Sequence, residues 1–459
     1  MVLSKLLLQP SWPTHSYCHP NHAHYNLKME VFETYDHEIV TPDNSSVSST
    51  NFPVLSNDSG HNHDHVSLVN TEGFDDVCTW LCDDDDLGSY SRTGTKNLLM
   101  AYAEAIEMEQ EELAKAIVKC ISEKANPNGS PIERIALNLF QHEENQEKAY
   151  LFQESLRNFN PAFRAFYDIF PYVRFAHLTA CSAIIEAVPT YVDLVYIVDF
   201  DILEGIQWPP IIEAMARIKK SLIITSIKHD LDQDSQFDQT RRHLCNFARS
   251  LGVDLKVQEM GMTQLAKEMV ERKSRSEFTA FNCMIGLLHM GRTRKTTQVV
   301  SFLKVARGHL AKNQGIITFG DDLEVERTRN YSDFSSFFNK NLAHYEALYE
   351  SIEHGFPSYL NEARIAMETL FLAPSVSSKS WLQKWEERRE SAVFCMNFEK
   401  GFGLKGERMS MESWKEAMEM VKEGESPYRI RIEGENGNEM VLEWKGTPLV
   451  RVCAWNVMS

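Results

Sequence analysis

Five short apolar runs alternate with helical segments between residues 194 and 319, and this alternation constrains the fold more than any other feature of the chain. Each run is apolar at consecutive positions, so both faces of its strand must be covered. The helical segments between the runs predict parallel strands joined by right-handed crossovers. We therefore expect an α/β protein with a doubly wound, Rossmann-like (methyltransferase-like) core. The five predicted strands are Leu194–Val198, Leu222–Ile227, Val253–Val257, Ala280–Met284 and Gly315–Phe319.

The chain before this core is helical in pattern. From residue 97 to 188, apolar side chains recur at intervals of three and four residues, as on one face of a helix. Ser130 and Glu133 fit a capping box, with Pro131 at the first helical position. These residues predict an N-terminal helical cap.

The chain after the core has strand character. Alternate residues from Tyr428 to Ile432 are apolar, and the tight-turn pair Asn436-Gly437 follows. The pattern returns through Met440–Trp444 and continues in a further run at Leu449–Val452. We expect these strands to form an antiparallel C-terminal edge, which is common in mixed sheets.

The first 94 residues differ in composition from the rest. They contain fourteen acidic residues against three basic ones, lack sustained periodicity, and are rich in Ser, Asn, Asp and His. Such a segment cannot bury enough apolar surface to offset its ordering entropy, so we expect residues 1–94 to be a disordered acidic tail. Within it, Phe74–Cys82 followed by Asp83–Asp86 is typical either of an acidic activation segment or of a solvated linker. Met29 is an alternative start to Met1.

Overall composition excludes several classes. The net charge of −18 does not favour a strongly basic nucleic-acid binder, and no apolar run approaches the length of a membrane span. Nine irregularly spaced cysteines suggest reduced thiols in a nuclear or cytoplasmic protein. Cys78 and Cys82 have no second ligand pair at zinc-finger spacing, so no metal site is expected.

The segment after the first strand is where a doubly wound fold would bind a cofactor. A dinucleotide or methyl-donor loop needs several glycines for close approach of the backbone, but residues 199–209 contain only Gly205 among bulky apolar residues. We expect this loop to be filled by its own side chains, with no cofactor. His229 is a candidate base without an evident nucleophile, so an enzyme is not expected. A small-molecule-binding, degenerate methyltransferase remains the alternative.

At this point the residues carry a family resemblance. Val195, Tyr196, Ile197, Val198 and Asp199, followed by Gly205, Gln207, Trp208 and Pro209, resemble the VHIID block of the plant GRAS family. Four further blocks follow the family order. By this resemblance residues 95–459 form a GRAS domain, with leucine-rich region I at 95–188, the VHIID region at 189–250, leucine-rich region II at 251–353, the PFYRE region at 354–425 and the SAW region at 426–459.

Two positions depart from the family pattern. Tyr196 stands where histidine is usual, and we expect it to alter local packing without destroying the fold. Cys181-Ser182 replaces a common Asn-Gln pair, which we expect to affect a partner-specific surface more than the architecture.

The resemblance implies a nuclear transcription regulator, also present in the cytoplasm in some cases. It would pair with another GRAS protein, with a homodimer as the alternative, and reach promoter DNA directly or through that partner. The acidic tail would contact the transcription machinery, and candidate DNA or partner contacts are Arg292, Arg294 and Lys295. Several phrases are closest to a subgroup that regulates root symbiosis, in nodulation and mycorrhiza, and strigolactone synthesis. A general role in growth or development is the alternative.

Overall fold

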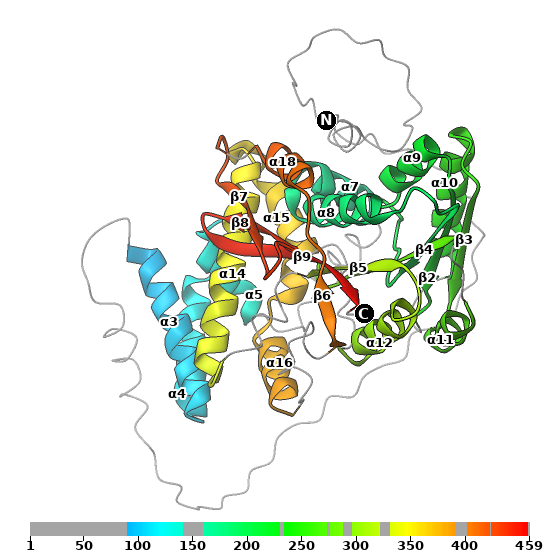
Figure 1. Ribbon diagram of the computed structural model, residues 1–459. Helices are drawn as coiled ribbons and strands as arrows, with labels where there is room; N and C mark the ends of the chain where they lie inside the picture. Colours follow the sequence, from blue (N-terminus) through cyan, green and yellow to red (C-terminus); the bar gives the residue numbers. More distant parts are fainter. Residues whose placement is uncertain are drawn as a thin grey trace, which may run out of the picture. The chain divides into compact units, whose positions relative to one another are not determined.

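The core of the protein is a mixed sheet of nine strands with helices on both faces (Figure 1). In this computed structural model the described residues are 90–140, 159–229, 234–272, 276–287, 296–321, 331–390, 402–422 and 424–457. Residues 1–89 of the acidic tail, which include Cys78 and Cys82, and the three basic residues Arg292, Arg294 and Lys295 lie outside these ranges.

Five parallel strands form one half of the sheet. They are β1 (Leu194–Asp199), β2 (Ser221–Ile227), β3 (Leu255–Met260), β4 (Glu277–Met284) and β5 (Gly315–Asp321). Their order is β3-β2-β1-β4-β5, with every neighbouring pair parallel. The order reverses between β1 and β4, which is the switch point of a doubly wound sheet. The predicted fold class is therefore confirmed.

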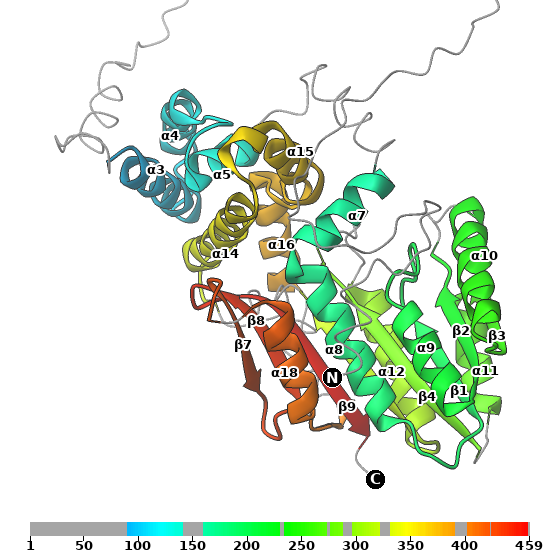
Figure 2. The same ribbon diagram turned by 90° about the horizontal axis from the view of Figure 1, so that it is seen from above.

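Helices cover both faces of the parallel half, as the uninterrupted apolar strands require. On one face lie α8 (Pro171–Ala187), α9 (Pro209–Ile218) and α10 (Asp234–Ser250) (Figure 2). On the other, α11 (Met262–Glu271) and α12 (Thr296–Leu310) pack on a core that includes Tyr196, Val198 and Phe281. The sequence pattern did not predict α11.

The antiparallel C-terminal edge is confirmed. β9 (Thr447–Val457) lies antiparallel beside β5, and β8 (Glu439–Trp444) and β7 (Tyr428–Glu433) continue the sheet outward. A three-residue strand, β6 (Leu404–Gly406), pairs with the end of β9 and had no counterpart in the sequence prediction. α18 (Met411–Met420) lies between β6 and β7 in sequence and packs against α8.

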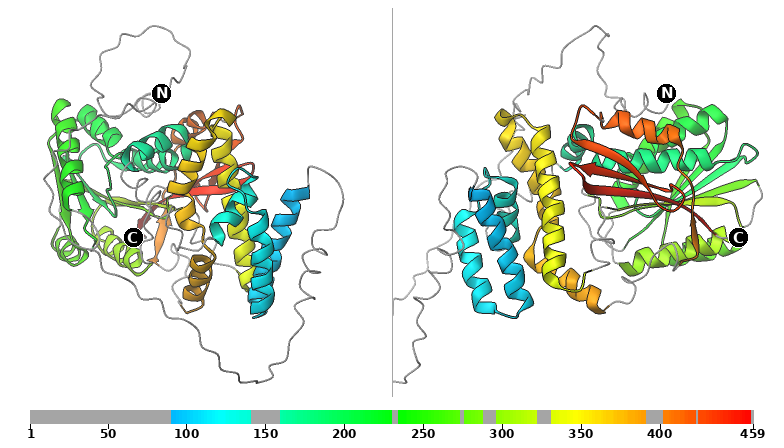
Figure 3. Two further views of the ribbon diagram at one scale, coloured as in Figure 1. Left: turned by 180° about the vertical axis from the view of Figure 1, so that it is seen from behind. Right: turned by 60° about the vertical axis from the view of Figure 1, so that its left-hand side comes forward.

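The helical cap is formed largely by segments from two distant parts of the chain. α3 (Tyr90–Glu107), α4 (Glu111–Lys124) and α5 (Pro131–Leu139) pack with the long helix α14 (Phe334–Gly355) (Figure 3). The capping box at Ser130 is present as predicted. α3 begins at Tyr90, so the expected boundary at residue 94 falls inside a helix.

The described ranges contain further helices. They are α7 (Phe159–Ile169), the short 3-10 helices η2 (Ser358–Leu360) and η3 (Ala373–Ser375), α15 (Asn361–Phe371) and α16 (Ser378–Glu390). None of the helices in the described ranges is long and apolar enough to cross a membrane. Among the described cysteines, Cys181, Cys245, Cys283 and Cys453 carry free thiols.

Candidate functional site

The candidate site lies at the carboxyl end of β1, where the strand order reverses. Side chains of a strand alternate between the faces of a sheet. Tyr196 and Val198 accordingly face the core beneath α11 and α12. Val195, Ile197 and Asp199 take the opposite face, toward α8 and α9. All five residues of the motif are at most 2% exposed, so none of them is available to a partner at the surface.

Asp199 is held by two hydrogen bonds from different elements. Its Oδ1 accepts from Asn282 Nδ2 at 2.9 Å, and its Oδ2 accepts from Trp208 Nε1 at 3.0 Å. Trp208 is the N-cap residue of α9, and Pro209 is the first residue of that helix. The carboxylate therefore joins β1 to β4 and to the start of the next helix.

The hydrogen bonds continue from Asn282 to two further residues. Gln207 and Asn282 pair through their amides, with Nε2 to Oδ1 at 3.2 Å and Nδ2 to Oε1 at 3.1 Å. Thr318 on β5 donates its hydroxyl to Asn282 Oδ1 at 2.9 Å. We call Asp199, Gln207, Trp208, Asn282 and Thr318 the Asp199 cluster. Asn282 and Thr318 were missed, although each is a polar residue inside an otherwise apolar run.

Burial controls the electrostatics of the Asp199 cluster. The pKa of Asp199 is raised to about 7 because burial, together with the nearby charge of Asp201, outweighs the opposing hydrogen bonds from Asn282 and Trp208. Burial also raises the pKa of the Cys181 thiol and lowers the pKa of His177 to about 3. Cys181 is thus a neutral thiol, and it donates to the main-chain oxygen of Gln207 at 3.3 Å. No activated nucleophile stands beside Asp199 in the described part of the chain.

The loop after β1 is locked against α10. Gly205 has φ +71°, and a Cβ at this position would lie 2.8 Å from Thr240 Cγ2. The Thr240 hydroxyl donates to the main-chain oxygen of Leu203 at 2.7 Å. Leu203 itself has φ +44°, a conformation in which a bulky residue is strained. His229, considered above as a base, instead bonds through Nε2 to the main-chain oxygen of Phe200 at 2.8 Å.

The cavity that the described residues form beside this loop is small. A cavity of about 20 Å³ is lined by residues that include Asp199, Ile202, Leu203 and Gln207. This volume accommodates one water, whereas pockets for small-molecule ligands have volumes of about 300–1,000 Å³. Among the described residues, no group of three His, Cys, Asp or Glu side chains could hold a metal ion.

Comparison with known proteins places this arrangement in a family. The family model described as the GRAS domain family matches residues 95–456. The chain belongs to the GRAS domain family. The match covers the helical cap, the parallel sheet and the antiparallel edge.

Several GRAS relatives resemble the chain over most of its length. The Medicago truncatula protein NODULATION SIGNALING PATHWAY 2 is 30% identical over 308 residues, which are 65% of this chain and 58% of that protein. The Lotus japonicus protein of the same name is 29% identical over 65% of this chain and 59% of its own length. The Arabidopsis thaliana DELLA protein RGL3 is 26% identical over 79% of this chain and 69% of its own length. The chain thus matches less than two thirds of the first and second of these proteins.

A solved GRAS structure agrees with the fold. The crystal structure of SCL7 from Oryza sativa has a TM-score of 0.56, with 21% identity, and covers 79% of this chain and 99% of that one. At this identity the likeness bears on the fold alone.

The atypical Tyr196 of this GRAS protein fills a defined space. Its hydroxyl lies 2.8 Å from Thr225 Oγ1 and donates to Glu268 Oε1 at 3.2 Å. The guanidinium of Arg272 stacks 3.9 Å from its ring centre and also pairs with Glu268 at 2.9 Å and with Glu277. Burial raises the pKa of Tyr196 to about 12. The tyrosine is therefore packed as a neutral phenol under a cation, without disturbing the sheet.

The second departure from the family pattern lies in the interior. Cys181 and Ser182 are each 1% exposed on α8. The expectation that this pair affects a partner-specific surface is therefore wrong. Cys181 instead contacts the main chain of Gln207, so the change belongs to the packing behind the Asp199 cluster.

A buried ion network joins the GRAS cap to the PFYRE region. Glu368 on α15 pairs with Arg364 at 2.7 Å and with Arg134 on α5 at 3.2 Å, and all three side chains are at most 6% exposed. Arg134 also reaches Glu353 on α14 at 3.0 Å. Charges in the interior persist when they are mutually paired. Helix α5 is thereby fixed to α14 and α15, which lie about 200 residues later in the sequence.

Proposed function

We propose that this GRAS protein is a non-enzymatic regulator of transcription that acts in the nucleus with a second GRAS protein. One observation favours a non-enzymatic role over an enzymatic one. Where doubly wound enzymes bind a cofactor, the described residues enclose a cavity of about 20 Å³, and the Asp199 carboxylate there is bonded to Trp208 and Asn282. A carboxylate occupied in this way positions a loop and a helix.

The relatives support two candidates for the biological process. The likeness to NODULATION SIGNALING PATHWAY 2 proteins, at 30% and 29% identity, supports a role in root symbiosis and in strigolactone-related gene expression. A general role in growth is the second candidate. It is favoured by the DELLA protein RGL3, whose alignment of 384 residues covers a larger share of this chain.

The proposed regulator has three kinds of contact. The helical cap and its flanking surfaces bind the second GRAS protein, with a homodimer as the alternative. The acidic residues 1–94 engage the transcription machinery. Promoter DNA is reached directly or through the partner, and Arg292, Arg294 and Lys295 are candidate contacts. If these residues bind phosphates, the affinity of the isolated chain for promoter DNA falls as salt rises.

The experiment that tests the proposal combines partner capture with a reporter. Tagged chain is purified from root nuclei, the co-eluting GRAS protein is identified, and the pair is assayed on a symbiosis-gene promoter in leaf cells. We expect a GRAS partner to co-elute and the pair to activate the reporter. Activation without any GRAS partner, or a co-eluting GRAS partner that leaves the reporter inactive, would contradict the proposal.

An Asp199→Ala variant tests the structural role in the same assay. We expect reduced partner capture and reduced activation, in proportion to the folded protein that remains. If partner capture, reporter activation and thermal stability were all unchanged, Asp199 would have no structural role.

A further inference from the structure

Two Asn-Gly pairs occur in the sequence, Asn128-Gly129 and Asn436-Gly437, and the structure describes both. An asparagine that precedes glycine is chemically labile, because glycine has no side chain to shield its nitrogen from the neighbouring amide. That nitrogen can attack the asparagine side chain and expel ammonia, which is the first step of deamidation. In a folded chain the reaction depends on how firmly the amide and the turn are held.

Asn436 lies at the tip of the hairpin that joins β7 to β8. The residue is exposed, and its side chain makes one hydrogen bond within the described ranges, from Nδ2 to the Gly406 carbonyl at 3.4 Å. This distance is at the long end for a hydrogen bond, so the amide is weakly restrained. Gly437 has φ +68°, and its N–H donates to the Gly434 carbonyl at 3.3 Å, again a long bond. Both reacting groups are therefore weakly held, and Asn436 is open to water.

The other Asn-Gly pair is held much more firmly. The Asn128 Oδ1 accepts from Asn361 Nδ2 at 2.6 Å, and the Asn128 N–H donates to Asn126 Oδ1 at 2.9 Å. The Gly129 carbonyl accepts from the buried Arg134 at 2.6 Å. The side-chain carbonyl that would be attacked is thus fixed, and so is the turn around it. The two pairs have the same chemistry under different restraints.

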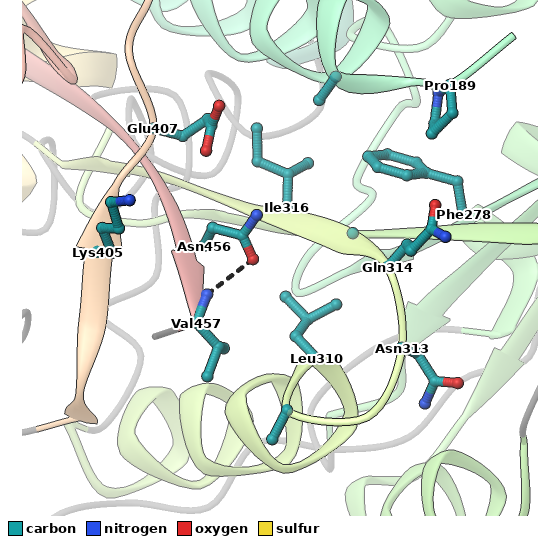
Figure 4. A pocket seen from close by; sticks show the side chains of 13 residues that line it. Pro189, Phe278, Leu310, Asn313, Gln314, Ile316, Lys405, Glu407, Asn456 and Val457 are labelled. Atoms are coloured by element: carbon teal, nitrogen blue, oxygen red, sulfur yellow. Dashed lines mark hydrogen bonds between the residues drawn. The ribbon is translucent and has the colours of Figure 1, made fainter. Parts of the chain in front are cut away.

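The hairpin tip also holds the segment that leads from β6 to α18. The Met409 N–H donates to the Gly437 carbonyl at 3.1 Å, and the Asn436 amide contacts the same segment. Residues of this segment line two cavities, one of about 640 Å³ and one of about 780 Å³, and Lys405 and Glu407 belong to both (Figure 4). Beside these cavities the segment depends on its pairing with β9 and on the hairpin tip.

We propose that Asn436 is a site of spontaneous deamidation, which loosens the hold of the β7–β8 hairpin on the segment before α18. The Gly437 nitrogen bonds to Cγ of Asn436, the Cγ–Nδ2 bond breaks, and ammonia leaves with the proton of the Gly437 N–H. Water then opens the resulting succinimide ring at either of its two carbonyls. The products are aspartate, or isoaspartate, in which the main chain runs through the former side-chain carbon.

Both products weaken the contact with the segment before α18. The amide that donates to Gly406 becomes a carboxylate, which has no proton to donate and repels the carbonyl oxygen. Isoaspartate also lengthens the main chain by one atom before Gly437, and this displaces the carbonyl that accepts from Met409. The modification needs no enzyme and accumulates with the age of the molecule. The inference does not depend on the proposed role in transcription.

Peptide mapping of the full-length chain by mass spectrometry tests the proposal. The protein is kept at mildly alkaline pH, either folded or in guanidinium chloride, and conversion at each Asn-Gly pair is followed over days. Unfolded, the two pairs should react at comparable rates. Folded, conversion at Asn436 should be at least about tenfold faster than at Asn128. Asn-Gly is also a common hairpin turn, and a role in the turn alone predicts that Asn436 stays unchanged in the folded chain.

Matched variants and hydrogen exchange test the consequence. Asn436→Gln should abolish conversion, because glutamine cyclises through a larger ring that forms more slowly, whereas the control Asn128→Gln should leave conversion at Asn436 unchanged. The Met409 amide of aged wild-type chain should exchange about three- to tenfold faster than that of fresh chain, as expected for the loss of one hydrogen bond. Aged Asn436→Gln should show no such change.

Three results would overturn the proposal. They are retention of Asn436 in the folded chain, conversion there no faster than at Asn128, and conversion that leaves the exchange of the Met409 amide unchanged. The first two comparisons use the wild-type chain alone, so they hold even if Asn436→Gln does not fold.

Discussion

Asp199→Ala removes the acceptor of two buried hydrogen bonds and so tests whether this residue holds the fold. In the wild-type chain Trp208 Nε1 donates to one carboxylate oxygen and Asn282 Nδ2 to the other. Each buried donor left without an acceptor costs about 1–3 kcal/mol. Loss of a partly ionised buried carboxylate offsets part of this cost. We expect the free energy of unfolding to fall by about 2–4 kcal/mol at neutral pH.

Urea denaturation followed by tryptophan fluorescence measures this change, because Trp208 lies in the cluster. Asp193→Ala is the matched control, since Asp193 is an exposed carboxylate just before the same strand. Surface substitutions of this kind change stability by within about 0.5 kcal/mol. A loss for Asp199→Ala no larger than that of the control would refute the reasoning.

Three further substitutions test neighbouring parts of the account. Gly205→Ala places a methyl group 2.8 Å from a side chain of α10, so it should destabilise the protein by about 1–3 kcal/mol. This loss should be clearly larger than that of Gly252→Ala, because Gly252 has a similar φ but faces open space. Equal losses in urea denaturation would exclude the close packing. Glu368→Gln removes the charge that pairs with buried Arg134, so the free energy of unfolding should fall by about 3–5 kcal/mol. An unchanged unfolding midpoint would contradict the ion network. Burial raises the pKa of Asp199 from 3.8 to about 7, so the folded state binds the proton more tightly than the unfolded state. The free energy of unfolding should therefore fall as pH rises from about 4 to 7, and Asp199→Asn should remove this part of the pH dependence. Identical pH profiles of the wild-type and Asp199→Asn proteins would show that Asp199 does not titrate in this window.

The parallel sheet could be predicted because its signal is local. Each strand is a short apolar run, and burial on both faces requires such a run wherever a strand lies between two layers of helices. The helix α11 carried a weaker signal. Only Leu265 and Met269 of its ten residues are buried, so its apolar face is narrow. β6 carried none, because its three residues form a strand only through pairing with the distant β9.

The site was predictable in part. Asp199, Gln207 and Trp208 stand close together in sequence, and the single glycine of their loop indicated crowding. Asn282 and Thr318 could not be joined to them, because their meeting depends on the strand order that sets β4 between β1 and β5. The contact that fixes Asp199 thus spans 83 residues of sequence.

The central claim is that the switch point of this GRAS sheet is a structural element and not a cofactor site. Titration calorimetry of the full-length chain with S-adenosylmethionine, the methyl donor that a methyltransferase-like core would bind, tests it most directly. The account predicts no saturable heat up to about 1 mM ligand, because a cavity of about 20 Å³ cannot admit it. A stoichiometric isotherm with a micromolar Kd, weakened by substitution at Asp199 in a variant that still folds, would contradict the account.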